Sequence, residues 1–332
     1  MRVAAALLAL PLLLSLGGAA SADDGRPART VERATELPPR RATTDRELVL
    51  LVGGLGSSAN DATWDALKAR YAGDPRYEVR RFGADPRFPY DTLGALEPNA
   101  ARLRQEVRAL SPRYTGVHLV THSMGGAVAD RAFAQGLSAA DGVRTYVALA
   151  APHNGATAAR IAQGALAQAQ DEALEVRAVV GAAVRDPAAP AARDLAARRV
   201  PAAVADVTRL DLRLATDLLV SGRDSRVPSV PSRVLLPSSL ETLEGHGGVL
   251  REPAVLDAVT ATIATGRVPP DTRGELLREA TGLVSNTADE LALLLLLAAA
   301  LAAVLAASLL RSARGIRLVT RPLAERVLRS AP

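Results

Sequence analysis

VHLVTHSMGG, residues 117–126, combines a short apolar run with a serine that lies between small residues. The β-branched and apolar residues of its first half predict a buried strand. The segment THSMG (121–125) fits the pattern G-x-S-x-G, with Thr121 at the first glycine position. In this pattern a strand turns sharply into a helix, and the serine hydroxyl projects above the carboxyl edge of a sheet. We therefore predict a tight turn at Ser123, followed by a helix over about 125–133.

Apolar runs alternate with helical patterns on both sides of this turn. Buried strands are predicted at 47–52, 77–82, 143–150, 216–221 and 233–236, and helices at about 64–71, 100–110 and 253–264. Strands that alternate with helices imply a parallel sheet covered by helices on both faces. The predicted fold class is therefore α/β.

The serine turn and the order of these elements resemble the α/β-hydrolase superfamily, specifically its lipase and esterase branch. The turn APHNG (151–155) is similar to that branch as well. Bacterial lipases and the GPI inositol-deacylase branch are the families that the chain resembles most, over about Glu47–Thr262. The resemblance implies an α/β-hydrolase fold with a mostly parallel sheet, and a serine hydrolase that needs neither a metal nor an organic cofactor.

The same resemblance implies a catalytic triad in the chain order serine, acid, histidine. Ser123 is the expected nucleophile, and His246, in a glycine loop before the last helix, is the expected base. Asp224, in the turn after the predicted strand 216–221, is the expected acid, with Asp217 as the fallback. A serine hydroxyl needs a neutral imidazole to remove its proton, and the carboxylate holds the imidazole tautomer.

A glycine-rich loop, GGLGSS (53–58), follows the first predicted strand. In lipases the loop after this strand supplies a backbone amide to the oxyanion hole. Glycines allow the backbone to approach a substrate oxygen closely. The resemblance therefore implies the amides of Leu55 and Met124 as the oxyanion donors.

The remaining histidines are expected to have other roles, and cysteine is absent. The chain has four histidines, too few and too scattered to suggest a metal cluster. His118 is expected to be a core histidine and His122 a packing residue. His153 is expected to be structural or to line a pocket, because the histidine of the triad comes last in this superfamily.

Residues 156–210 differ in composition from the rest of the chain, because they are rich in Ala and Arg and contain several prolines. Alanine-rich stretches with apolar positions three and four residues apart predict helices. In this fold an insertion at this point usually forms a lid. A helical lid is one interpretation, and surface helices without a gating role are the other.

The amino-terminal residues have the features of a secretory signal. Arg2 precedes an apolar stretch that ends in small residues at Ala20-Ser21-Ala22, which fits a cleavage site. Residues 1–22 are therefore predicted to be a signal peptide. Residues 23–46 lack periodicity and predict a flexible leader into a hydrolase domain at 47–265.

The carboxyl-terminal residues predict a membrane anchor. Residues 291–310, LALLLLLAAALAAVLAASLL, carry no charge, and their number matches a bilayer-spanning helix. Residues 311–332 carry six arginines and one glutamate, which places this tail in the cytoplasm by the positive-inside rule. Residues 266–290 would form a juxtamembrane stalk. Because the basic excess lies in the tail, nucleic acid is not an expected partner.

Together these features predict a single-pass membrane protein whose catalytic domain lies outside the cytoplasm. The expected activity is hydrolysis of carboxylic esters, and the expected partners are a lipid or other ester and the membrane. Two alternatives stay open from the sequence. An acyltransferase would use the same acyl-enzyme intermediate, and a non-catalytic ectodomain would use the hydrolase fold for binding only.

Overall fold

The computed structural model describes residues 42–58, 62–168, 189–197, 204, 206–295, 297–298, 301–302 and 305. The predicted signal peptide (1–22) and basic tail (311–332) lie outside the described residues, as does most of the predicted leader. The fold described below is therefore that of the expected hydrolase domain and the helix that follows it.

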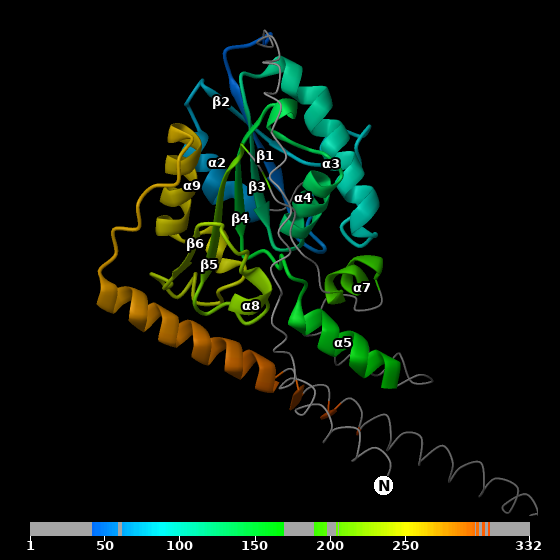
Figure 1. Ribbon diagram of the computed structural model, residues 1–332, viewed down its shortest axis with the longest axis vertical. Helices are drawn as coiled ribbons and strands as arrows, with labels where there is room; N and C mark the ends of the chain where they lie inside the picture. Colours follow the sequence, from blue (N-terminus) through cyan, green and yellow to red (C-terminus); the bar gives the residue numbers. More distant parts are fainter. Residues whose placement is uncertain are drawn as a thin grey trace, which may run out of the picture. The chain divides into compact units, whose positions relative to one another are not determined.

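A six-stranded parallel sheet forms the centre of the domain, in the order β2-β1-β3-β4-β5-β6 (Figure 1). The strands are β1 (Glu47–Val52), β2 (Tyr77–Arg81), β3 (Val117–His122), β4 (Val143–Leu149), β5 (Thr208–Leu214) and β6 (Ser232–Leu235). Every pair of neighbouring strands is parallel. The prediction of a mostly parallel α/β sheet is confirmed.

Helices cover both faces of this sheet, as Figure 1 shows. The α-helices are α2 (Asp65–Tyr71), α3 (Leu96–Leu110), α4 (Met124–Ala134), α5 (Thr157–Gln168), α7 (Pro190–Ala196), α8 (Gly222–Ser225) and α9 (Pro253–Thr265). Short 3-10 helices are Ala62–Trp64, Ser111–Arg113, Ala139–Asp141 and Gly248–Leu250. Helices α3 and α4 pack together on one face, and α2 and α9 on the other.

The residues of β1 show why the sheet is buried on both faces. Leu48, Leu50 and Val52 belong to the core beneath α3 and α4, whereas Val49 and Leu51 belong to the core beneath α2 and α9. All five are at most 1% exposed. Alternate side chains of a strand point to opposite faces, so a strand covered on both sides is continuously apolar.

The prediction of a strand at 216–221 is wrong. The fifth strand is β5, Thr208–Leu214, and the residues after it form a loop. Strand β5 was not recognised because only one of its faces is apolar: Leu210, Leu212 and Leu214 enter a core, whereas Arg209, Asp211 and Arg213 alternate with them and are buried in ion pairs. Charged residues at every second position concealed a buried strand.

The predicted lid region is therefore shorter than expected at its carboxyl end, because residues 208–210 belong to β5. Within it the structure describes α5 and α7, which pack against each other. Both helices follow the carboxyl end of β4 in the chain, on the side of the sheet edge where Ser123 lies. Residues 169–188 and 198–203 lie outside the described residues.

After α9, residues 275–295 form a further helix, drawn in orange in Figure 1. This helix includes most of the predicted stalk and the first residues of the predicted anchor. Several residues of the stretch 291–310 lie outside the described part. Among the residues that are described, no helix is both long enough and apolar enough to cross a bilayer.

Candidate active site

Ser123 lies at the turn between β3 and α4, as the sequence predicted. Its backbone has φ 53° and ψ −128°, a strained conformation for a residue with a side chain. A Cβ on Gly125 would lie 2.3 Å from the carbonyl oxygen of Val52 and 2.7 Å from that of Gly53. Only glycine therefore lets the first turn of α4 pack against the end of β1. Thr121, which replaces a glycine of the pattern, is fully buried in β3.

The imidazole of His246 meets the hydroxyl of Ser123. Nε2 of His246 lies 2.9 Å from Oγ of Ser123, although 123 positions separate the two residues in the chain. The loop that carries His246 precedes α9 and is held by two carboxylates. Glu244 accepts hydrogen bonds from the amides of Gly247 and Gly248, and the buried Glu252 accepts bonds from Ser238 and Thr242.

The acid beside His246 is Asp217, which corrects the prediction of Asp224. Oδ2 of Asp217 lies 3.0 Å from Nδ1 of His246, and its other oxygen accepts the amides of Leu219 and Val220. Because β5 ends at Leu214, Asp217 occupies the loop at the carboxyl edge of the sheet. The sequence had placed this residue inside a strand, so the wrong strand produced the wrong first choice.

Asp224 instead holds the start of α5. One of its oxygens accepts the amide of Thr157 at 2.9 Å, and the other accepts the hydroxyl of Thr157 and a guanidinium N–H of Arg160. A carboxylate at the first turn of a helix satisfies amides that have no partner within the helix and complements the helix dipole. Asp224 therefore links the loop after β5 to the first helix of the lid region.

His122, next to the nucleophile, contacts the loop of the base. Its Nε2 lies 2.9 Å from the backbone oxygen of His246, and because a carbonyl only accepts, this nitrogen donates. The two imidazole rings lie 4.9 Å apart, and the Trp64 ring meets His122 edge-on. The expected packing role thus includes a hydrogen bond that fixes the backbone at His246.

His118 and His153 are both buried, and the prediction that His118 is a core histidine is confirmed. His118 is 2% exposed in β3, where Nδ1 lies 2.9 Å from the hydroxyl of Thr145. His153, also 2% exposed, belongs to a buried ionic cluster described below. Neither lies in a contact with Ser123 that the described residues show.

The glycine loop after β1 lies directly against the nucleophile. A Cβ on Gly54 would lie 2.9 Å from Cβ of Ser123 and 3.3 Å from its Oγ. Leu55, the first residue expected to donate to an oxyanion, comes next in the chain and is half-buried against the core. Met124, the second, is the first residue of α4, where amides have no partner within the helix. Both residues thus flank Ser123.

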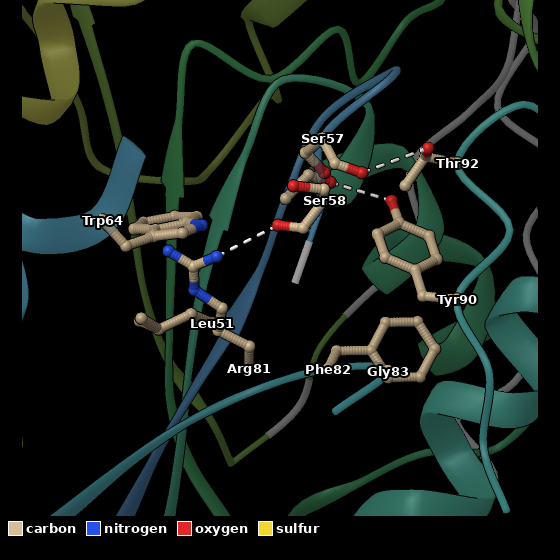
Figure 2. Close-up of a pocket in the computed structure, with 10 residues that line it drawn as sticks. Leu51, Ser57, Ser58, Trp64, Arg81, Phe82, Gly83, Tyr90 and Thr92 are labelled. Atoms are coloured by element: carbon tan, nitrogen blue, oxygen red, sulfur yellow. Dashed lines mark hydrogen bonds between the residues drawn. The ribbon is translucent and has the colours of Figure 1, made fainter. Parts of the chain in front are cut away.

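Side chains behind this loop fix its carbonyl groups, as Figure 2 shows. Tyr90 donates to the oxygen of Gly53 at 2.8 Å, Thr92 to that of Ser57 at 3.3 Å and Arg81 to that of Ser58 at 3.0 Å. They line a cavity of about 90 Å³ beside this loop. These bonds fix the backbone of the loop that lies against the nucleophile.

The contact between His246 and Asp217 shifts their pKa values in opposite directions. Burial alone would lower the pKa of His246, but the carboxylate of Asp217 raises it above its usual value. Burial alone would raise the pKa of Asp217, but the imidazole of His246 and the two loop amides hold it below its usual value. Asp217 is therefore ionised at neutral pH and able to stabilise an imidazolium.

A second, fully buried ionic cluster lies beneath the turn after β4. His153 Nδ1 lies 2.6 Å from Asp130 of α4 and its Nε2 lies 3.5 Å from Asp211 of β5, while Arg209 contacts both carboxylates. Tyr146 donates to Asp130. Burial alone would lower the pKa of His153, but the two carboxylates raise it to about 9. The cluster ties α4, β4 and β5 together next to the nucleophile turn.

The described residues contain no group of three or more His, Cys, Asp or Glu side chains that could hold a metal ion. The cluster of His153, Asp130 and Asp211 already contains the cation Arg209, which compensates its charge.

Comparison with known proteins gives one family and several structures of similar fold. The family model described as "PGAP1-like alpha/beta domain" matches residues 101–174, which include Ser123 and α4. Over the residues that it covers, this match agrees with the resemblance drawn from the sequence. No curated protein matches the sequence of this chain.

Three of the solved structures to which the chain is distantly similar are the following. A lipase of Bacillus licheniformis in its mature form has 14% identity and a TM-score of 0.43, over 69% of this chain and 95% of that one. A thioesterase of the prodiginine pathway of Streptomyces coelicolor has 19% identity and a TM-score of 0.42, over 70% of this chain and 91% of that one. Lipase B of Aspergillus fumigatus has 15% identity and a TM-score of 0.42, over 86% of this chain and 74% of that one. Similarities this distant do not define what the chain acts on.

The buried cluster predicts a pH-dependent stability. The pKa of His153 is about 9 in the folded protein, against an ordinary value of 6.5. Its contribution, on the order of 3 kcal/mol, is therefore complete below pH 6.5 and disappears as the pH rises through about 9. We expect wild type to unfold at a higher temperature than His153→Gln at pH 6, and the difference to shrink by pH 10. Thermal unfolding of both proteins from pH 6 to pH 10 measures this difference in unfolding temperature. A difference that does not change with pH would contradict the raised pKa of His153.

Proposed function

We propose that this protein is a serine hydrolase that cleaves carboxylic esters, with Ser123 as nucleophile, His246 as base and Asp217 as acid. The observation that carries the proposal is the continuous hydrogen-bonded line from Oγ of Ser123 through His246 to Asp217. These groups come from three separate loops at the carboxyl edge of one parallel sheet. Active sites of open α/β sheets lie at this edge.

The chemistry follows from the protonation states of these groups. Neutral Nε2 of His246 accepts the proton of Ser123 while Oγ forms a bond to the ester carbonyl carbon. The resulting imidazolium returns that proton to the leaving alkoxide as the ester C–O bond breaks, which leaves an acyl-enzyme. Water, deprotonated by the same imidazole, then attacks the acyl group and releases the acid and free Ser123.

Charge that develops on the carbonyl oxygen needs donors already in place. We propose the amides of Leu55 and Met124, since the loop of Leu55 lies against Ser123 and Met124 starts α4. Each such donor contributes on the order of 3 kcal/mol to lowering the barrier. The hydrogen bonds of Tyr90, Thr92 and Arg81 to the same loop support this geometry from behind.

We further propose that the protein is anchored in a membrane by residues 291–310, with the catalytic domain outside the cytoplasm. The support is the sequence: a signal-like amino terminus, 20 uncharged apolar residues and a basic tail. A site close to a bilayer would meet lipid esters at high local concentration. The proposed substrates are therefore esters with an apolar acyl chain.

The nucleophile is tested by Ser123→Ala in the full-length protein in detergent. We expect wild type to hydrolyse nitrophenyl esters and to react with a fluorophosphonate probe, and the variant to lose activity by about 10⁴-fold or more. Ser232→Ala, at an exposed serine at the start of β6, is the matched control and should behave as wild type. Equal rates for wild type and Ser123→Ala would refute the enzyme, and absence of labelling in wild type would favour a binding role.

The identity of the acid is tested by comparing Asp217→Asn with Asp224→Asn. The first should lower kcat on the order of 10³–10⁴-fold, because the imidazole loses its orienting carboxylate. It should also move the rise of rate with pH to lower pH, since Asp217 raises the pKa of His246. Asp224→Asn removes a helix cap of about 1 kcal/mol and should stay within about ten-fold of wild type. The opposite ranking would restore Asp224 as the acid.

The topology is tested by adding protease to intact spheroplasts. The catalytic domain should be digested, while an epitope placed after Pro332 stays protected. Extraction with carbonate should leave the protein in the membrane. A protected catalytic domain, or complete release by carbonate, would reject the anchor and the argument for lipid substrates.

A further inference from the structure

The residues after α9 contact the catalytic domain at several points between Gly266 and Asp289. Thr208, at the start of β5, donates to the carbonyl of Gly266 at 2.7 Å, Val268 packs on the core beneath α2 and α9, and Arg233 of β6 donates to the carbonyl of Pro269. Arg273 donates to the carbonyl of Val234 at 2.5 Å. The chain thus runs along the edge strand β6 before the helix at 275–295 begins.

This helix turns one face toward the domain. Thr281 and Ser285 are 2% and 3% exposed, and Ala292 is 8% exposed. Together with Asp289 they follow one another at intervals of four, four and three residues, which is the spacing of one helix face. Leu276, Leu283 and Leu294, by contrast, are exposed. A face of small and polar residues therefore docks the helix closely on the domain.

The docked face reaches the loop that carries Asp217. Oδ2 of Asp289 accepts the amide of Gly222 at 2.9 Å, and Oδ1 lies 3.5 Å from the guanidinium of Arg213. Arg213, 5% exposed, also donates to the hydroxyl of Ser285. A Cβ on Gly222 would lie 2.8 Å from the guanidinium of Arg213 and 3.2 Å from Oδ2 of Asp289, so a side chain at this position would displace them.

These two contacts bracket the acid. Arg213 belongs to the end of β5, four residues before Asp217, and Gly222 begins α8, five residues after it. Asp289 therefore ties together the two ends of the loop whose middle holds the carboxylate beside His246. Asp217 is fully buried, and its carboxylate accepts the amides of Leu219 and Val220. The amide of Ala215 donates to the carbonyl of Leu235 at 2.8 Å, which holds the start of the loop to β6. Asp289 adds to these contacts by fixing both ends of the loop.

We propose that the helix at 275–295 is an integral part of the catalytic domain, and that Asp289 is a positioning residue that sets the alignment of Asp217 with His246. The inference rests on the proposed function and adds to it. A carboxylate at this position accepts a backbone amide and pairs with a buried guanidinium at once; without it the amide of Gly222 would lose this acceptor and Arg213 this ion pair. The burial of Asp289, partly opposed by the amide and Arg213, raises the pKa of its carboxyl.

The placement also has a consequence for the proposed anchor. Asp289 lies two residues before the apolar stretch that begins at Leu291, a distance of about 3 Å along a helix. The loop of the acid is thus bound to the helix at the point where the uncharged stretch starts. The segment 266–290 acts as a rigid connection that fixes the orientation of the active site, and not as a flexible spacer.

The test compares Asp289→Asn with Glu290→Gln in the full-length protein, in detergent and with a nitrophenyl ester. Glu290 is the adjacent, exposed carboxylate of the same helix and serves as the matched control. We expect Asp289→Asn to lower kcat by about 10- to 100-fold with KM nearly unchanged, as misplacement of an active-site group does. Glu290→Gln should equal wild type.

A double variant separates positioning from general destabilisation. If Asp289 acts through Asp217, Asp289→Asn should cause no further loss of kcat in the Asp217→Asn background, because the group that it aligns has gone. Trypsin cleavage after the exposed Arg223 should also become faster in Asp289→Asn, a readout that does not depend on activity.

The outcomes separate the two proposals. Three outcomes would overturn the role of Asp289 while Ser123-dependent hydrolysis stands. Asp289→Asn could be as active as Glu290→Gln, or it could lower kcat as much in the Asp217→Asn background as in wild type. Its loss of kcat could also appear only where the unfolding temperature of the variant is lower. If wild type shows no Ser123-dependent hydrolysis, the proposed function itself fails, and unchanged trypsin cleavage in Asp289→Asn would then overturn the docking role independently.

Discussion

The close approach of α4 to the end of β1 is the constraint on which the candidate site depends. Because Gly125 carries no side chain, the helix can begin directly against the carbonyl of Val52, and the chain must then turn through the strained backbone at Ser123. That turn places Oγ between the glycine loop on one side and the imidazole of His246 on the other. The stability of the surrounding sheet, buried on both faces, maintains the strain.

Strand β5 connects the core of the domain to the site through its charged face. Arg209 and Asp211 join the buried cluster of His153 and Asp130 near the middle of the sheet, and Arg213 meets Asp289 at its carboxyl end. Buried charges are costly unless they are paired, so the partners of each fix the elements that carry them. The same strand therefore sets the position of α4 beneath Ser123 and the start of the loop of Asp217.

Hydrogen bonds from neighbouring residues hold each member of the site in place. His122 fixes the backbone of His246, the amides of Leu219 and Val220 fix Asp217, and Tyr90 fixes the carbonyl of Gly53. Several of these supports come from segments far apart in the chain. The geometry of three side chains thus depends on contacts spread over the whole carboxyl edge of the sheet.

The sequence by itself determined the parallel α/β sheet and the turn at Ser123, because these depend on local patterns of apolar runs and glycines. The contact of that serine with His246 was what the resemblance implied, from the order of the triad in the chain. The sequence did not determine which carboxylate lies beside that histidine. Charges alternate along β5, so its periodicity matched no buried strand, and Asp224 was predicted where the structure has Asp217. Likewise, nothing local indicates that the helix at 275–295 reaches the loop of Asp217, since Asp289 finds Arg213 and Gly222 only when the chain folds back across more than sixty positions. Pairing between buried charges is a property of tertiary structure, and here it decided which carboxylate faces the histidine.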